Sequence, residues 1–276
     1  MKMFTSQRNA KSFGALVLAG LSLVAGQALA ADLGGSLKDE PVYAEPAPSF
    51  SWRGFYLGLN AGADWDGRSV HLSPADPAAN IYFNGGAVPH HLSGGDQTRF
   101  IGGGQAGYNW QSGALVYGIE VDYSGIAGNG DSATVRTNAL GFATFDSRGS
   151  SHVDQLATLR GRIGWTVAPR TLLYATGGLA VGQTHLSSSI TTPFTPCNGA
   201  GLCVTGSSSD WRAGWTVGGG VEHAISRNWT IRAEYLHYDL GTTSFTANDP
   251  AFPAPVFQTK SRFEGDIVRA GVNFKF

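Results

Sequence analysis

Eight stretches of the chain alternate apolar and polar residues with a period of two. Successive side chains of a β-strand point to opposite faces, so each stretch predicts a strand with one apolar and one polar face. The last stretch is regular throughout, with Val268 and Phe276 on one face and Arg269 and Lys275 on the other. The predicted strands are Phe55 to Trp65, Phe100 to Trp110, Leu115 to Tyr123, Ala157 to Val167, Leu172 to Val181, Trp211 to His223, Trp229 to His237 and Val268 to Phe276.

The connectors between these stretches alternate in length. Tight turns follow the second, fourth and sixth stretches, whereas long segments rich in Gly, Ser, Thr, Asp and Asn follow the others, at 66–99, 124–156, 182–210 and 238–267. An even number of antiparallel strands with short turns at one end and long loops at the other is typical of outer-membrane barrels. We therefore expect an all-β fold: an eight-stranded antiparallel up-and-down transmembrane β-barrel over residues 52–276, with short periplasmic turns, four long extracellular loops and both termini in the periplasm.

The two faces of the predicted strands differ in charge. The face assigned to lipid carries no Asp, Glu, Lys or Arg in any of the eight stretches. This matters because one Arg or Lys facing the middle of a bilayer costs about 2 to 4 kcal/mol. Aromatic residues gather near the strand ends, as in the interfacial girdles of membrane barrels. The inner girdle would hold Phe55, Tyr108, Trp110, Trp165, Trp229, Phe274 and Phe276, and the outer one Trp65, Phe100, Tyr123, Trp211 and Tyr235.

Eight charged residues are expected to face the lumen. Buried charges persist when they are paired, and eight strands enclose only enough space for side chains to fill. We therefore expect a lumen mostly plugged by salt bridges, with a narrow porin for small solutes as the alternative. Neighbouring strands should place Glu120 and Asp122 opposite Arg160 and Arg162, Glu222 near Arg232, and Glu234 near Arg269.

Composition and the first residues fit an exported membrane protein. Charged residues make up only 14% of the chain, and the net charge of -1 gives no indication of nucleic-acid binding. Residues 1–30 combine basic Lys2 and Arg8, an apolar run and Ala-Leu-Ala at 28–30, which predicts a cleaved signal peptide. Residues 31–51 contain three prolines and are expected to form a periplasmic tether.

The two cysteines, Cys197 and Cys203, fall in one predicted loop. Nearby cysteines of an exported protein most often pair, and closing so short a loop stabilises a fold by about 2 kcal/mol. Their spacing does not match a zinc knuckle. We expect a disulfide, with free thiols as the alternative.

Several strand sequences resemble a known family. The segments WRGFYLGLNAGADW, LVYGIEVDYSG and WTIRAEYLHYDLG resemble the small outer-membrane barrels of alpha-proteobacteria described as the porin family, which are similar to the membrane domain of OmpA. The resemblance implies a barrel that supports envelope integrity and surface interactions, with haem binding or weak porin activity in some members. It also implies that the barrel assembly machinery reads a terminal aromatic residue, here Phe276.

Candidate chemistry outside the lumen is sparse. His90 and His91 are weak haem candidates, because imidazole binds haem iron, and a haem-binding surface protein stays an alternative. A lipid A-modifying enzyme would need a base beside a nucleophile near the outer rim. His237 and His152 are predicted there, on a strand and in a loop respectively, but the sequence fixes no such constellation around them. We therefore expect no enzymatic activity, no cofactor and no metal.

The expected partners follow from the predicted location. They are outer-membrane lipids, lipopolysaccharide and, during biogenesis, the barrel assembly machinery. The lipid-facing residues Gly102, Gly104 and Ala106 would also leave room for another copy of the chain.

Overall fold

The computed structural model describes residues 50–66, 69–94, 97–128, 133–139, 143–192, 203–249 and 252–276. The chain divides into two units, Met1–Pro46 and Ala47–Phe276. The predicted signal peptide and residues 31–49 of the predicted tether lie outside the described residues. The described residues of the second unit are all-β apart from a 3-10 turn η1 (Pro77–Ala79) and a short helix α1 (Asn80–Asn84). In the described part of the chain, no helix has the length and apolar character needed to cross a membrane.

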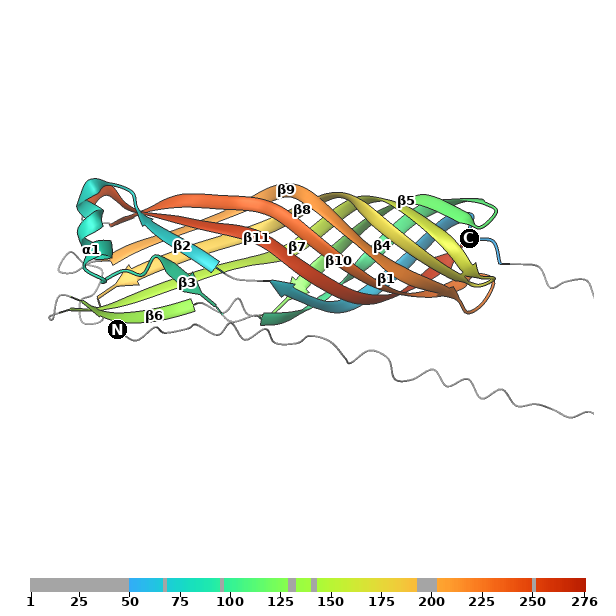
Figure 1. The fold of residues 1–276 in the computed structure, drawn as a ribbon, viewed down its shortest axis with the longest axis horizontal. Coiled ribbons are helices and arrows are strands. Elements are labelled where there is room, and N and C mark those ends of the chain that lie inside the picture. The colour runs from blue at the N-terminus through green and yellow to red at the C-terminus, as the bar shows by residue number, and fades with distance from the viewer. Residues whose placement is uncertain are drawn as a thin grey trace, which may run out of the picture. The chain divides into compact units, whose positions relative to one another are not determined.

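Eleven antiparallel strands form one sheet that closes on itself (Figure 1). The closed circuit runs through β1, β4, β5, β7, β8, β9, β10 and β11, and β11 pairs back with β1. Off this circuit, β2 pairs with β11 and β3, and β6 pairs with β7. The strands are β1 Gly54–Asp66, β2 Ser69–Pro74, β3 His91–Ser93, β4 Gln97–Ser112, β5 Leu115–Ala127, β6 Ala133–Ala139, β7 Ala143–Ala168, β8 Thr171–Thr191, β9 Cys203–Ala224, β10 Trp229–Asp249 and β11 Phe252–Lys275.

The three predicted tight turns are present, and they lie at one end of the barrel, here called the turn end. They connect β4 to β5, β7 to β8 and β9 to β10. In the first of them Gly113 adopts a φ of 59°, a left-handed conformation that favours glycine. The opposite end, called the loop end, holds α1, β2, β3 and β6 (Figure 1).

The strands run further toward the loop end than the sequence predicted. β7 begins at Ala143 rather than Ala157, β8 ends at Thr191 rather than Val181, and β11 begins at Phe252 rather than Val268. β9 and β10 are extended in the same direction. Much of the four predicted long loops is therefore strand, and the described residues form eleven strands instead of eight because β2, β3 and β6 also form there.

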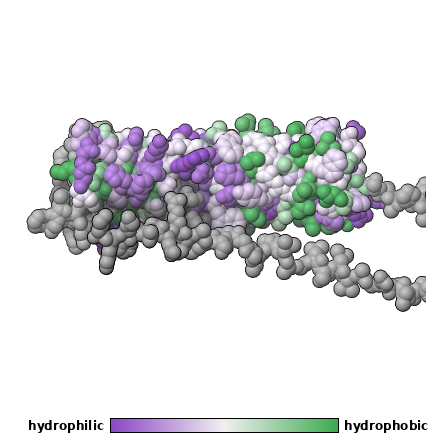
Figure 2. All heavy atoms as spheres, viewed as in Figure 1, coloured by the Kyte–Doolittle hydropathy of each residue, from purple (hydrophilic) through white to green (hydrophobic). Residues whose placement is uncertain are grey.

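An inversion of side-chain polarity explains the missed extensions. On β8 the outward residues change from Leu173 and Leu179 near the turn end to Ser187 near the loop end, while the inward residues become Leu186 and Ile190. The alternation continues unbroken, but the apolar face passes from the outside of the barrel to the inside. Figure 2 shows the result on the surface: hydrophobic residues gather over the turn half and hydrophilic residues over the loop half.

The interior is filled in layers along the barrel axis. At the turn end Trp52, Val116, Leu172, Tyr174 and Ala224 form a small apolar cluster, against which Phe50 packs. Charged residues fill the next layer. At the loop end lies a larger apolar core that includes Leu72, Leu92, Leu186, Ile190, Tyr238, Phe257 and Phe263.

Candidate functional site

All eight charged residues predicted for the lumen lie inside the barrel, and each has at most 5% of its surface exposed. They come from five strands of the closed circuit. Their positions follow from the two-residue period, because Glu120 and Asp122 on β5, like Arg160 and Arg162 on β7, lie two residues apart and share the inner face. The other four are Glu222 on β9, Arg232 and Glu234 on β10 and Arg269 on β11.

Arg160 connects opposite walls of the barrel. Its guanidinium binds Glu120 and Asp122 on the adjacent β5, the latter at 2.9 Å. Its Nη1 also lies 3.0 Å from Glu234 Oε1 on β10, a strand that does not neighbour β7. Arg269 joins the same acids, with Nη1 3.1 Å from Asp122 and Nη2 2.7 Å from Glu234. Four strands are thus tied together by one group of charges.

The ion pair of Glu222 differs from the expected one. Glu222 lies opposite Arg232 in the β9–β10 register, but its Oε2 lies 2.8 Å from Arg162 Nη2 on β7. Arg232 instead contacts Glu120 across the interior at 2.6 Å. Long side chains reach past the neighbouring strand in so narrow a barrel, so register alone does not determine the partners.

Two tyrosines also contact the charge network. Tyr56 Oη donates to Glu120 at 2.6 Å and accepts from Arg162 Nη1 at 3.1 Å. The ring of Tyr174 lies against the Arg162 guanidinium, 4.1 Å from its central carbon. Removing one partner of a buried ion pair costs about 3 to 5 kcal/mol, because it leaves an uncompensated charge. Each charge of the network therefore depends on its partners to remain buried.

A second charged group, which the sequence reasoning missed, lies closer to the loop end. Arg99 Nη2 is 2.8 Å from carboxylate oxygens of both Asp64 and Asp66, and its Nη1 donates to the carbonyl of Val153. Tyr238 Oη donates to Asp64 at 3.0 Å. The spacing of two between Asp64 and Asp66 was the available signal, since it places both on the inner face of β1.

The adjacent histidines proposed as haem candidates contact different neighbours. His91 on β3 faces His71 on β2, with ring centroids 4.3 Å apart. His90 packs on Phe83, with centroids 4.9 Å apart. His90 and His91 are adjacent in the sequence but therefore contact different side chains and do not face one common site.

The histidines considered for catalysis each contact a carboxylate. His237 Nδ1 lies 2.9 Å from Asp266. His152 was expected in a loop, but it lies on β7, with Nε2 3.5 Å from Asp154.

The remaining predicted residues lie near the ends of strands. The Phe276 ring packs against Phe55 and Phe274, with centroids 5.6 and 5.1 Å away, at the turn end. Cys203, at the start of β9, is disulfide-bonded. Cys197 lies outside the described residues, so its pairing stays a prediction.

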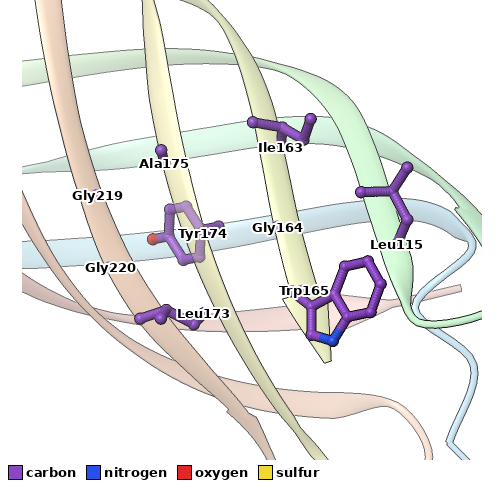
Figure 3. Close-up of a pocket in the computed structure, with 9 residues that line it drawn as sticks. All are labelled: Leu115, Ile163, Gly164, Trp165, Leu173, Tyr174, Ala175, Gly219 and Gly220. Atoms are coloured by element: carbon purple, nitrogen blue, oxygen red, sulfur yellow. The ribbon is translucent and has the colours of Figure 1, made fainter. Parts of the chain in front are cut away.

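An apolar groove of about 600 Å³ lies on the outer surface of the turn half (Figure 3). Its walls include Ile163, Trp165 and Leu173, and glycines leave it open between them. The full lining is Leu115, Ile163, Gly164, Trp165, Leu173, Tyr174, Ala175, Gly219 and Gly220.

Known proteins are similar to this chain over most of its length. The family model of the outer membrane protein beta-barrel domain matches residues 16–276. The 31 kDa outer-membrane immunogenic protein of Brucella melitensis is 34% identical over 264 residues, covering 95% of this chain and 99% of that protein. The 22 kDa outer membrane protein of Rhizobium leguminosarum is 30% identical over 210 residues, covering 74% and 82%.

Among solved structures, the outer membrane protein OprG from Pseudomonas aeruginosa matches with a TM-score of 0.48 and 11% identity, covering 81% of this chain and 96% of that one. The family match and the Brucella and Rhizobium relatives agree with the ring-closed antiparallel sheet. This chain belongs to the outer membrane protein β-barrel domain family.

Proposed function

We propose that this barrel supports the bacterial envelope and displays a folded extracellular extension, and that its lumen is closed by side chains. The observation that carries the proposal is the continuous filling of the interior. Apolar residues, the eight-residue charge network, the Arg99 group and a second apolar core follow one another along the axis. Small barrels of eight strands enclose space that side chains can fill, and these inward side chains support such a filling here.

The proposed orientation places the turn end in the periplasm. The eight strands of the closed circuit then cross the membrane as an eight-stranded barrel, and the four connections at the loop end extend outside the cell. Outward Leu59, Leu159 and Leu179 are 73%, 55% and 63% exposed, which suits contact with lipid rather than water. The polar outer surface of the loop half suits an aqueous environment, and its apolar core would stabilise it there.

The proposed partners are lipids. Acyl chains of phospholipid or lipopolysaccharide would fill the groove in Figure 3, because its walls of Ile163, Trp165 and Leu173 are apolar and face outward. The assembly machinery would read the strand that ends in Phe276. The small residues Gly102, Gly104 and Ala106 on β4 leave a shallow facet where another copy of the chain could approach. We propose no catalytic role.

Electrical recording tests the closed lumen. Purified protein, refolded and inserted in planar bilayers, should give no steady conductance. The double variant Glu120→Ala/Arg232→Ala removes one acid and the base 2.6 Å away, keeps the net charge and opens space, so its conductance should exceed that of the wild type. The control Arg262→Ala/Glu264→Ala removes an exposed pair on the outer surface and should stay closed. Steady wild-type conductance of a large-pore kind would refute the closed lumen.

A further inference from the structure

A β-bulge interrupts the pairing of β7 with β8 in the loop half. The register passes from Val153↔Thr184 to Gln155↔Gln183, so Asp154 has no opposite residue on β8. Val153 is buried inside the barrel, whereas Asp154 and Gln155 are both only partly buried on its outer side. Bulges re-aim side chains and occur often beside functional sites. Here the bulge adds one outward carboxylate to the surface.

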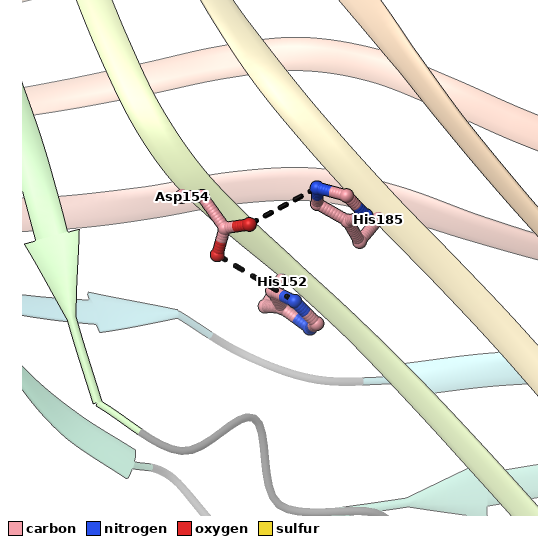
Figure 4. Close-up of side chains that lie close together, drawn as sticks. All are labelled: His152, Asp154 and His185. Atoms are coloured by element: carbon pink, nitrogen blue, oxygen red, sulfur yellow. Dashed lines mark ion pairs between the residues drawn. The ribbon is translucent and has the colours of Figure 1, made fainter.

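That carboxylate lies between two histidines (Figure 4). His152 and His185 are opposite each other in the β7–β8 register, and their rings stack at 5.2 Å with an angle of 15°. Asp154 Oδ1 lies 3.5 Å from His152 Nε2, and Asp154 Oδ2 lies 3.0 Å from His185 Nε2. One potential ligand atom from each residue can be chosen so that all three lie within 4.8 Å of one another.

We propose that His152, Asp154 and His185 bind one divalent transition-metal ion, with Zn²⁺ as the preferred ion. Two imidazole nitrogens and one carboxylate are ligands that Zn²⁺ accepts, and three protein ligands leave a fourth position for water. Ca²⁺ and Mg²⁺ prefer sets made only of oxygen atoms. The site is therefore selective for the borderline transition metals.

The geometry needs only small side-chain rotations to close around the ion. A tetrahedral ion with ligand bonds of about 2.0 to 2.1 Å holds its ligand atoms about 3.4 Å apart. The two contacts of Asp154 already have separations near this value. The three side chains are 27% to 41% exposed, so they can rotate and an ion can reach them from the solvent.

The position of the cluster fits an ion that arrives from outside the cell. Gln155, next to Asp154, accepts a hydrogen bond of 2.6 Å from Tyr123, which belongs to the predicted outer aromatic girdle. The cluster therefore lies just beyond the lipid-facing band. That the ion comes from outside the cell rests on the proposed orientation of the barrel, whereas binding of the ion does not depend on it. Because the ligands come from β7 and β8, the bound ion joins two strands and should stabilise the folded barrel.

Zinc titration of the full-length barrel tests the site. Metal-free protein, refolded in detergent, should bind one Zn²⁺ in competition with a chromophoric chelator, and an excess of Ca²⁺ or Mg²⁺ should not displace it. His152→Gln, Asp154→Asn and His185→Gln should each weaken binding by more than about 10-fold, since loss of an outer-shell partner alone commonly costs that much. Far-UV circular dichroism checks that each variant is folded.

The control is the double variant His71→Gln/His91→Gln. It removes the other opposed pair of exposed histidines and should leave the affinity unchanged. Electron paramagnetic resonance of the Cu²⁺-loaded wild type should show imidazole nitrogen ligands, which gives a readout independent of any variant. Failure of the wild type to bind one ion, unchanged affinity in the three single variants, or loss of binding in the control would overturn the proposal.

Discussion

Arg162 on β7 and Glu222 on β9 form an ion pair of 2.8 Å although β8 lies between their strands. Both side chains are almost fully buried. Glu222 also accepts hydrogen bonds from Thr230 and Asn273, which fixes its carboxylate against β10 and β11. The pair therefore connects one wall of the barrel to another through the interior.

Replacing one member of this pair should lower the free energy of unfolding more than replacing both members. Arg162→Met leaves the Glu222 carboxylate buried without its main partner, so we expect a loss of about 3 to 5 kcal/mol in the free energy of unfolding. Arg162→Met/Glu222→Met should cost less than either single variant, and therefore clearly less than their sum. Urea unfolding in detergent micelles, followed by tryptophan fluorescence, measures all four proteins. Additive losses would show that the two residues are not coupled.

A charged residue introduced on the outward face of the turn half should lower the free energy of unfolding. Leu159 is 55% exposed near the middle of the apolar band, so Leu159→Arg should lower the free energy of unfolding from a lipid bilayer by about 2 to 4 kcal/mol. Ser187→Arg, on the outer face of β8 in the polar half, is the matched control and should have little effect. Equal losses in both variants would argue against a membrane boundary between these positions.

The apolar core of the loop half should keep this half folded. Phe257 is fully buried and packs against Phe83, with ring centroids 5.5 Å apart. Phe257→Ala should cost about 3 to 5 kcal/mol through lost burial and the cavity left behind.

Limited proteolysis should locate this effect. Cleavage of Phe257→Ala should increase in the loop half while the turn half stays protected in lipid. Ile81→Ala removes an exposed side chain from α1 and should behave like the wild type. Cleavage of Phe257→Ala at the wild-type rate would mean that this core does not stabilise the extension.

One carboxylate of the loop half should make stability depend on pH. A hydrogen bond from Arg262, together with the backbone N–H of Gly241, lowers the pKa of Asp239 below its ordinary value. The folded state therefore favours the ionised carboxylate. Its contribution is present above the unfolded pKa of about 4 and is lost as the pH falls through the folded pKa.

The variant Asp239→Asn tests the sign of this effect. It should be less stable than the wild type at pH 7, and the difference should shrink in unfolding measurements taken below about pH 4. Arg262→Ala should produce the same change in the pH profile, because it removes the cause of the shift. A difference that stays constant down to pH 2 would contradict the assignment.

The sequence was sufficient to predict the strands of the turn half and insufficient for the loop half. From Leu173 to Val181 the outward residues are apolar, which marks a strand against lipid. Beyond Val181 the outward residues are polar, so the segment resembles a loop in sequence. Its strand character shows only in the inward residues Leu186 and Ile190, which continue the apolar positions on the other face. The physical reason for this change of pattern is that, in the proposed orientation, one strand passes from lipid around the turn half to water around the loop half.

The inward direction of the charged residues was also predictable, but not their partners. The period of two places Arg162 and Glu222 inside the barrel. It cannot show that they meet across the lumen, because that contact depends on the barrel's width and on the reach of both side chains. The cluster of His152, Asp154 and His185 was not predicted as a site, since it requires β7 and β8 to continue as paired strands beyond the girdle, with Asp154 left without an opposite residue at a bulge.

We expect the seam between β1 and β11 to form late in assembly. Tyr56 pairs with Lys275 and Asp66 with Gly265, so the ring joins its first strand to its last. Such distant partners gain nothing until the intervening chain has been ordered, which makes their pairing intrinsically slow. Before the seam forms, β1 and β11 each present an open edge that can pair with other chains. We therefore expect the closure of this one junction to separate a nascent chain at risk of aggregation from a finished barrel.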